Sequence, residues 1–260
     1  SSAALEVLMA YIILYLENPE KIDRVEVAKL CQKVENEFVG VNCGIMDQFA
    51  IGMGKDSSAI LLDCNTLEYK YSNVNLKDEV IVIANTNKRR GLADSKYNER
   101  RAECEEALEE LQKVIDIKTL GDLTEEAFER YKSAIKSEVR QKRAKHAVYE
   151  NQRTIKAVKA LRAGDIEEFG RLMVASDTSL REDYEVTGKE LDTLVAAALK
   201  QPGVIGSRMT GAGFGGCTVS IVKTDAIDNF IEKVGKEYKD TIGYAADFYV
   251  ADIGGGPVVL

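Results

Sequence analysis

Five glycines stand within the thirteen residues from Gly206 to Thr218, in the string GSRMTGAGFGGCT. Glycine tolerates positive φ, and its lack of a side chain lets backbone N–H groups approach a ligand. Gly211, Gly213 and the two glycines that follow them could therefore form a nest of N–H donors suited to phosphate. The hydroxyls of Ser207 and Thr210 flank this nest. A glycine-rich hairpin between two buried strands would explain the same spacing, so both interpretations stay open.

A carboxylate, Asp47, stands inside the otherwise apolar string GIMDQFA, which begins at Gly44. A buried acid is costly unless a cation or hydrogen-bond donors partner it, and such partnered acids concentrate at functional sites. Asp47 could instead cap a helix that begins at Gln48. Glu35 lies twelve residues earlier, at the edge of an apolar helical face, where periodicity alone favours a solvated side chain.

The elements that must position these groups follow from hydrophobic periodicity. Residues 3–16 are apolar except for Glu6, which predicts a helix buried on most sides. Asp23 opens a second helix with a capping box, and Gly40 ends that helix. Residues 58–74 alternate as a hairpin and complete a first lobe.

A second lobe follows, with a short apolar strand from Glu79 to Ala84 and a long helix from Asp94. Residues 119–200 form a predicted run of helices with start signals at Thr124, Asp165 and Thr187. After the glycine loop we expect a strand, a helix from Asp225 to Tyr238 and a last strand from Asp247 to Asp252. Strands and helices in this order predict an α+β chain whose second lobe is ferredoxin-like.

The helical run contains the chain's single histidine, His146. Basic residues surround His146 in the sequence, which indicates a solvated helical face. We therefore expect no His-dependent catalytic triad. A Gly-x-x-x-x-Gly-Lys-Ser/Thr loop and a His-Arg-Asp string are also missing from the sequence, which argues against a P-loop enzyme and a protein kinase.

Length and composition set the outer limits. A chain of 260 residues accommodates two lobes, which we place at residues 1–77 and 78–260. The net charge of −8 argues against nucleic acid as a partner. Five scattered cysteines without a Cys-x-x-Cys pair indicate neither a disulfide framework nor a zinc cage. No apolar run reaches the roughly 20 residues of a membrane span, and no cationic leader opens the chain, so we expect a soluble, cytoplasmic protein.

The string GSRMTGAGFGGCTV resembles the third motif of the GHMP kinases, a superfamily of small-molecule kinases. The strings GIMDQF and NTNKRRGLADSKYNERRAEC resemble, within that superfamily, the galactokinase family. The opening residues Ser1 to Val7 resemble the second half of the second motif, without its glycines. The first motif is not in this sequence. The resemblance implies the two-lobed GHMP kinase fold, with a ferredoxin-like C-terminal lobe that carries helical insertions.

The resemblance also implies a reaction, the ATP-dependent phosphorylation of galactose at its anomeric hydroxyl with the help of Mg²⁺. Asp47 then corresponds to the residue that contacts the accepting hydroxyl, and Gly44 and Tyr97 approach the sugar. The resemblance implies that the serine turn and the glycine loop bind the phosphates of ATP. It also implies that one carboxylate and one hydroxyl bind magnesium. The residues implied for the nucleotide are Ser1, Ser2, Gly211 and Gly213, and those implied for magnesium are Ser2 and Glu35.

The missing first motif carries most sugar-binding residues of the family and an arginine near the reacting hydroxyl. We therefore expect a truncated chain that is inactive alone and associates through exposed apolar faces, although a full-length parent would be a monomer. One alternative is another sugar kinase, such as an N-acetylgalactosamine kinase. A second is a sensor that binds sugar and ATP without turnover, against which the intact run from Ser1 to Ala4 speaks. Neither nucleic acid nor a membrane is an expected partner.

Overall fold

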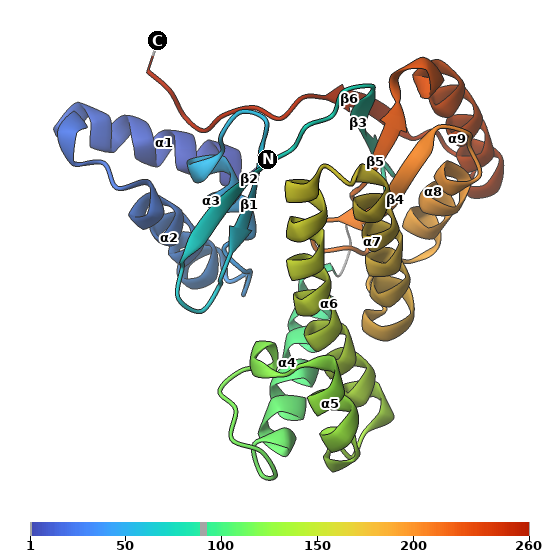
Figure 1. Cartoon of the computed structure of the whole chain (residues 1–260). Coiled ribbons are helices and arrows are strands. Elements are labelled where there is room, and N and C mark those ends of the chain that lie inside the picture. Colours follow the sequence, from blue (N-terminus) through green and yellow to red (C-terminus); the bar gives the residue numbers. More distant parts are fainter. Residues whose placement is uncertain (1, 89–92, 260) are drawn as a thin grey trace. The chain divides into compact units, whose positions relative to one another are not determined.

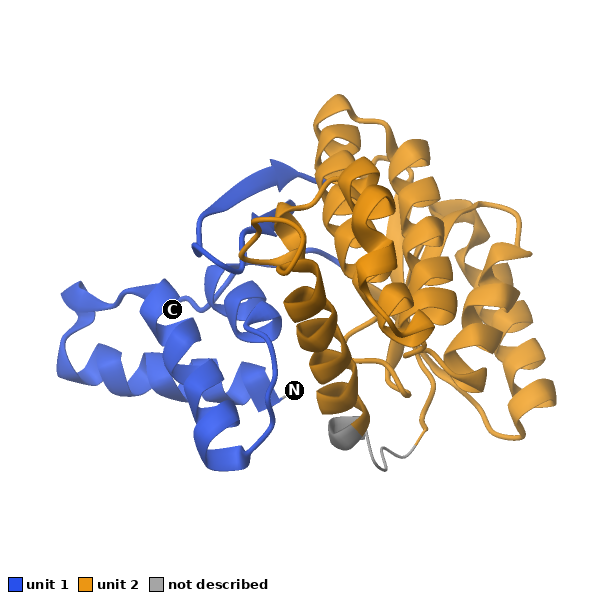
Figure 2. Cartoon of the chain, turned by 90° about the horizontal axis from the view of Figure 1, so that it is seen from below, with its two compact units in different colours: residues 1–75, 252–260 blue, residues 76–251 orange. Residues whose placement is uncertain are grey.

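The computed structural model describes residues 2–88 and 93–259, with the backbone alone at residues 93–95. The chain divides into two compact units, of which unit 1 comprises residues 1–75 and 252–260 and unit 2 comprises residues 76–251 (Figure 2). The first division therefore lies after residue 75, close to the expected limit at residue 77. Residues 252–260, which we expected in the second lobe, belong to unit 1 instead.

Unit 1 combines helices with a hairpin (Figure 1). Its elements are α1 (Ser2–Glu17), α2 (Arg24–Val34), a π-helical turn (Glu35–Val39), α3 (Met46–Met53), β1 (Ser58–Leu62) and β2 (Tyr69–Asn73), with a 3₁₀ turn (Pro19–Lys21) between the first two helices. Asp23 caps α2 by accepting hydrogen bonds from the N–H groups of Val25 and Glu26, at 2.9 and 3.3 Å. Gly40 ends the π-helical turn with a φ of 85°. The predicted cap, helix end and antiparallel hairpin are confirmed.

The first helix is less buried than its sequence predicted. Ala3 and Val7 are buried, whereas Leu5, Ile13 and Leu16 are 63%, 53% and 78% exposed. Within unit 1, α1 packs against α2 and α3, which cover one side of the helix. The expectation of burial on most sides was therefore wrong for the described residues, and α1 presents an apolar face to solvent.

The returning C-terminal segment is fixed to unit 1 through its backbone. The N–H of Gly256 donates to the carbonyl of Gly54 at 2.8 Å, and the guanidinium of Arg24 donates to the carbonyl of Pro257 at 2.8 Å. A Cβ built on Gly256 would lie 2.9 Å from the carbonyl oxygen of Gly52, so the C-terminal tail approaches α3 more closely than a side chain allows. These contacts hold a segment that is distant in sequence beside the end of α3.

Unit 2 is built on a four-stranded antiparallel sheet with the strand order β4-β5-β3-β6 (Figure 1). Its strands are β3 (Glu79–Asn85), β4 (Val204–Thr210), β5 (Cys217–Lys223) and β6 (Asp247–Ala251), and its α-helices are α4 (Ala93–Leu111), α5 (Glu125–Tyr131), α6 (Glu138–Ala163), α7 (Ile166–Ser179), α8 (Lys189–Leu199) and α9 (Ile227–Ile242). Short turns of 3₁₀ helix at Leu120–Asp122, Lys132–Ala134 and Thr224–Ala226 and of π-helix at Leu180–Tyr184 connect them. This strand order is that of a split β-α-β-β-α-β lobe, so the predicted ferredoxin-like arrangement, with helices inserted between β3 and β4, is confirmed.

The sheet of unit 2 shares a core with α8 and α9. Leu194 of α8 and Phe230 and Val234 of α9 pack against Val82 and Val222 on the sheet, and all five side chains are at most 1% exposed. Burial of large apolar side chains contributes about 1.5–3 kcal/mol each. The sheet is thereby fixed against these two helices.

The predicted helix starts agree with the structure in two cases out of the three. Thr124 caps α5 by accepting the N–H of Ala127 at 3.1 Å, and Asp165 caps α7 by accepting the N–H of Glu168 at 2.9 Å. The third start was wrong by one residue, because the residue that precedes α8 is Gly188.

His146 is buried, and the expectation of a solvated face was wrong. It is 8% exposed, its Nδ1 lies 3.0 Å from Oγ of Ser179, and its ring stacks on Tyr184 at 4.5 Å between centroids. Among the basic neighbours that indicated solvent, Arg143 pairs with Glu103 at 2.7 Å and Lys145 pairs with Asp183 at 3.0 Å. Burial is the main cause that lowers the pKa of His146 to about 4.

We expect the ring of His146 to titrate near pH 4, which can be followed by NMR without ambiguity because the chain has one histidine. An unfolded chain takes up this proton near pH 6.5. Between these values the unfolded state binds more protons, so His146 lowers the free energy of unfolding as the pH falls, by about 2 kcal/mol at pH 5. A His146→Gln variant should lack this contribution, and a titration midpoint near 6.5 would contradict the burial.

Candidate functional site

The glycine loop connects β4 to β5, whose last pair joins Thr210 to Cys217. Gly211, Gly213 and Phe214 have φ values of 81°, 84° and 58°, all in the left-handed region. The hairpin interpretation is therefore correct for the strands. An anion-binding nest combines right-handed and left-handed residues, and these three residues are of the left-handed kind.

The loop is held from outside by the segment that precedes α8. The N–H of Phe214 donates to the carbonyl of Val186 at 2.7 Å, so this donor is not available to a ligand. A Cβ on Gly213 would lie 2.2 Å from the same carbonyl oxygen, whereas Gly211 is exposed and has nothing within 4 Å of its Cβ position. Of the two glycines predicted to hold phosphate, Gly213 packs against the backbone of Val186, and Gly211 faces solvent.

Two further contacts fix the ends of the loop. Both the N–H and the hydroxyl of Thr86, just after β3, donate to the carbonyl of Gly216 at 2.9 Å. On the other side, Oδ1 of Asp177 accepts the N–H of Met209 at 3.0 Å. Because β4 is an edge strand, its outward N–H groups need partners from outside the sheet. Asp177 supplies one, and its burial raises the pKa of its carboxyl.

A basic side chain lies against the loop. Nζ of Lys88 pairs with Oε2 of Glu190 at 2.9 Å, and a Cβ on Gly215 would lie 3.3 Å from Cδ of Lys88. The ion pair is partly shielded, with side chains 35% and 19% exposed. The loop therefore combines backbone N–H groups with a neighbouring cationic group, which suits an anion.

Unit 1 carries the other predicted groups. Ser2 is exposed in the first turn of α1, where unpaired N–H groups and the positive end of the helix dipole favour an anion. Ser1, also predicted to bind phosphate, lies outside the described residues. Glu35 is half-buried at the point where α2 changes to a π-helical turn. Such turns are frequent at functional sites because they redirect a side chain.

Glu6 was not predicted as a site residue, and it is the group that Glu35 meets. Burial first, and then the hydrogen bond and charge of Glu35, raise the pKa of the Glu6 carboxyl, while the amide of Gln48 lowers it. The sequence did carry a signal, because Glu6 alone interrupts an apolar helix. Its position four residues after Ser2 places both side chains on one face of α1.

Gly44, Asp47 and Tyr97 lie where a ligand could reach them. Gly44 is exposed in the loop ahead of α3, and Asp47 is exposed in the first turn of that helix. The expectation of a buried Asp47 was wrong, because the periodicity of α3 turns Gln48 and Phe49 inward and Asp47 outward. Tyr97 is half-buried in α4, close enough to Tyr184 to contribute to its raised pKa. Asp47 and Tyr97 belong to different units.

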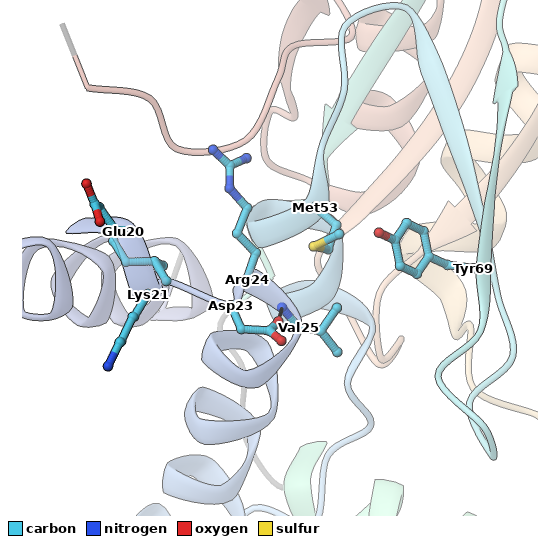
Figure 3. A pocket seen from close by; sticks show the side chains of 8 residues that line it. Glu20, Lys21, Asp23, Arg24, Val25, Met53 and Tyr69 are labelled. Atoms are coloured by element: carbon cyan, nitrogen blue, oxygen red, sulfur yellow. Dashed lines mark hydrogen bonds between the residues drawn. The ribbon is translucent and has the colours of Figure 1, made fainter. Parts of the chain in front are cut away.

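A hollow of about 500 Å³ in unit 1 is lined by none of the residues predicted to bind substrate, nucleotide or metal (Figure 3). It is lined by the segment from Glu20 to Val25 and by Met53 and Tyr69. Its charged groups already have structural partners, since Asp23 caps α2 and Arg24 reaches toward the C-terminal tail. This hollow gives no sign of a ligand of its own.

The cluster around Glu6 fits a hard divalent cation. Oε2 of Glu6 and Oε1 of Gln48 are buried and have no hydrogen-bond partner among the residues that the structure describes, and Gln48 is 3% exposed. The nearby thiols of Cys31 and Cys43 have raised pKa values, first through burial and then through the charges of Glu6 and Glu35, so they offer no thiolates. Oxygen donors alone suit magnesium. Within the described ranges, no set of three or more His, Cys, Asp or Glu side chains could hold a metal, so any such site would need other oxygen donors as well, such as the Gln48 amide or the Ser2 hydroxyl.

Comparison with known proteins places the chain in a family. The model of the GHMP kinases N-terminal domain matches residues 1–55, and that of the GHMP kinases C-terminal domain matches residues 157–240. The galactokinase of Ligilactobacillus salivarius is 60% identical over 260 residues, which cover 100% of this chain and 67% of that protein. The chain belongs to the galactokinase family of GHMP kinases. The galactokinase of Clostridium beijerinckii is 64% identical over 98% of this chain and 66% of its own length.

Solved structures of GHMP kinases share this fold. The galactokinase of Lactococcus lactis, complexed with galactose, superposes with a TM-score of 0.95 at 53% identity, over 98% of this chain and 66% of that one. The mevalonate kinase of L. major, at 16% identity and a TM-score of 0.63 over 98% of this chain and 66% of that one, shows the same fold at greater distance. The chain thus spans about two thirds of the galactokinases it matches. The predicted GHMP kinase fold is confirmed.

The geometry of the glycine loop predicts unequal effects of alanine at its two predicted phosphate glycines. Gly213→Ala should lower the free energy of unfolding of unit 2 by more than Gly211→Ala, because it adds displacement of the Val186 carbonyl to a backbone strain of about 1–3 kcal/mol. Gly211→Ala should show the strain alone, since its Cβ would meet open space. Urea unfolding of both variants tests this, and equal losses would contradict the packing at Gly213.

Proposed function

We propose that this chain is the greater part of a galactokinase, which transfers the γ-phosphoryl group of ATP to the anomeric hydroxyl of galactose. The observation that carries the proposal is the TM-score of 0.95, at 53% identity, to a galactokinase complexed with galactose. Another sugar kinase and a sensor without turnover are not favoured, since curated relatives at 56–64% identity are named galactokinase.

Asp47 is the proposed acid at the reacting hydroxyl. The hydroxyl oxygen attacks the γ-phosphorus of ATP, the bond from that phosphorus to the bridging oxygen breaks, and ADP leaves. The proton of the hydroxyl goes to the carboxylate of Asp47 and then to solvent. Such a group contributes roughly 10²- to 10⁴-fold to a rate, and the exposure of Asp47 leaves its oxygens accessible to a sugar.

Phosphate binding is proposed for two places, one in each unit. In unit 1, Ser1, Ser2 and the free N–H groups at the start of α1 would hold phosphate oxygens. In unit 2, Gly211 and Gly213 would do so through the backbone nest. Ser2 and Glu35 would hold magnesium, which when bound offsets the negative charge of the phosphates.

The sugar is proposed to contact Gly44 and Tyr97 as well as Asp47. Gly44 leaves room beside α3, and Tyr97 offers a hydroxyl that can donate to or accept from a neutral sugar. We further propose a cytoplasmic enzyme whose full-length form is a monomer, with the two lobes divided near residue 77. Within the described segments, no helix has the length and apolar character to cross a bilayer.

The function is tested by offering the full-length protein ATP, magnesium and a panel of sugars. We expect galactose to be phosphorylated with the highest kcat/KM and N-acetylgalactosamine to react much more slowly. A higher kcat/KM for another sugar would reassign the specificity, and binding of galactose without ADP release would favour the sensor.

Asp47→Asn in the full-length protein should lower kcat by roughly 10²- to 10⁴-fold, because the amide cannot accept the proton. The thermal unfolding temperature should stay nearly unchanged, since exposed side chains contribute little to stability. Asp56→Asn, at another exposed acid of unit 1, is the matched control and should keep the parent's kcat. A near-normal kcat in Asp47→Asn would remove this residue from the chemistry.

Tyr97→Phe keeps the ring and removes the hydroxyl, so it isolates one hydrogen bond. We expect kcat/KM for galactose to fall by an amount that corresponds to an activation free energy about 0.5–1.5 kcal/mol higher. The KM for ATP should be little affected. Steady-state kinetics with each substrate varied in turn measures both effects. A changed ATP dependence with an unchanged galactose dependence would place Tyr97 away from the sugar.

A further inference from the structure

Three helices of unit 1 direct oxygen-bearing side chains to one cluster. Glu6 comes from α1, Glu35 from the end of α2, and Gln48 from α3. Glu6 contacts both other side chains, because the carboxyl of Glu35 and the amide of Gln48 each form a side-chain hydrogen bond with it. The cluster is therefore a tertiary feature that no single helix creates.

The cluster is left with unsatisfied acceptors. Oε2 of Glu6 and Oε1 of Gln48 are buried and lack a hydrogen-bond partner in the described part of the chain. An unpaired buried acceptor costs about 1–3 kcal/mol, and a charged one costs more. Gln48 is 3% exposed, so bulk water cannot donate a hydrogen bond to its buried amide oxygen. A bound cation would satisfy both of these acceptor oxygens.

The position of the cluster relates it to the start of α1. Glu6 lies one helical turn after Ser2, on the same face, at the helix end that favours phosphate. A cation that accompanies ATP keeps phosphate oxygens and water as ligands and takes one or two carboxylates from the protein. Glu35 is the first such carboxylate in the proposed function, and the contact with Glu6 places a second one beside it.

We propose that Glu6 is a second carboxylate ligand of the divalent cation, beside Glu35, and that the amide oxygen of Gln48 completes the protein's donor set. This inference rests on the proposed function, since the cation it describes is the one that accompanies ATP. It assigns Glu6 and Gln48 a role that their burial in an apolar helix packing would otherwise not require.

The test is Mn²⁺ binding, measured by the EPR signal of free Mn²⁺ with the full-length protein and variants. Glu6→Gln and Gln48→Leu should each raise the Kd for Mn²⁺ about 10-fold or more, as Glu35→Gln should. Glu37→Gln is the matched control, because Glu37 lies on the same π-helical turn but is exposed and pairs with Lys33 at 3.7 Å. Its Kd should equal that of the parent.

Unfolding temperatures separate binding from structure. Without cation, Glu6→Gln should unfold at the parent's temperature or above it, because the substitution removes a buried charge next to Glu35. With Mn²⁺, the parent should gain stability and Glu6→Gln should gain much less.

A Kd for Glu6→Gln within twofold of the parent's, or a parent that binds no Mn²⁺, would overturn the proposal. Weakened Mn²⁺ binding in Glu6→Gln, together with a parent that phosphorylates no sugar, would retain the cation site and reject the kinase function. If the parent phosphorylates galactose and Glu6→Gln leaves the Mn²⁺ affinity unchanged, the kinase function would stand and the role of Glu6 in the cation site would be rejected.

Discussion

The half-buried side chains of Glu6 and Glu35 lie beside each other in unit 1, and burial and the charge of Glu35 both raise the pKa of the Glu6 carboxyl. Glu6 is held in this position because Ala3 and Val7, on the same side of α1, are buried. The packing that gives unit 1 its core thus also creates a demand for positive charge. The same helix begins with N–H groups that suit an anion, so in the proposed enzyme one element would serve both the phosphates and the cation.

In unit 2, the proposed phosphate site uses backbone N–H groups rather than side chains. Several residues of its glycine loop have left-handed backbone conformations, among them the non-glycine Phe214. The backbone strain at such a residue persists only where surrounding contacts enforce the conformation. The carbonyl of Val186, the hydroxyl of Thr86 and the carboxylate of Asp177 provide these contacts from three different segments. The protein's own contacts therefore hold the loop in its conformation, which would lower the entropy cost of the phosphate binding proposed for it.

Local signals in the sequence were sufficient for most of the fold. Caps at Asp23 and Asp165, the stop at Gly40 and the alternating hairpin depend on neighbouring residues, and the structure has them where predicted. Burial was harder to predict, because it depends on distant segments: His146 is covered by α7 and by the π-helical turn Leu180–Tyr184, and α1 is left open on one side. At the site, family motifs indicated Asp47 and Glu35, whereas Glu6 belongs to a contact between helices that periodicity could not show.

The most direct measurement is the crystal structure of the full-length protein with Mn²⁺ and a non-hydrolysable ATP analogue, using the anomalous scattering of manganese. We predict a manganese peak within about 2 to 2.5 Å of carboxylate oxygens from both Glu6 and Glu35. A peak bound by Glu35 while Glu6 stays more than about 4 Å away, or manganese held by other residues altogether, would contradict it.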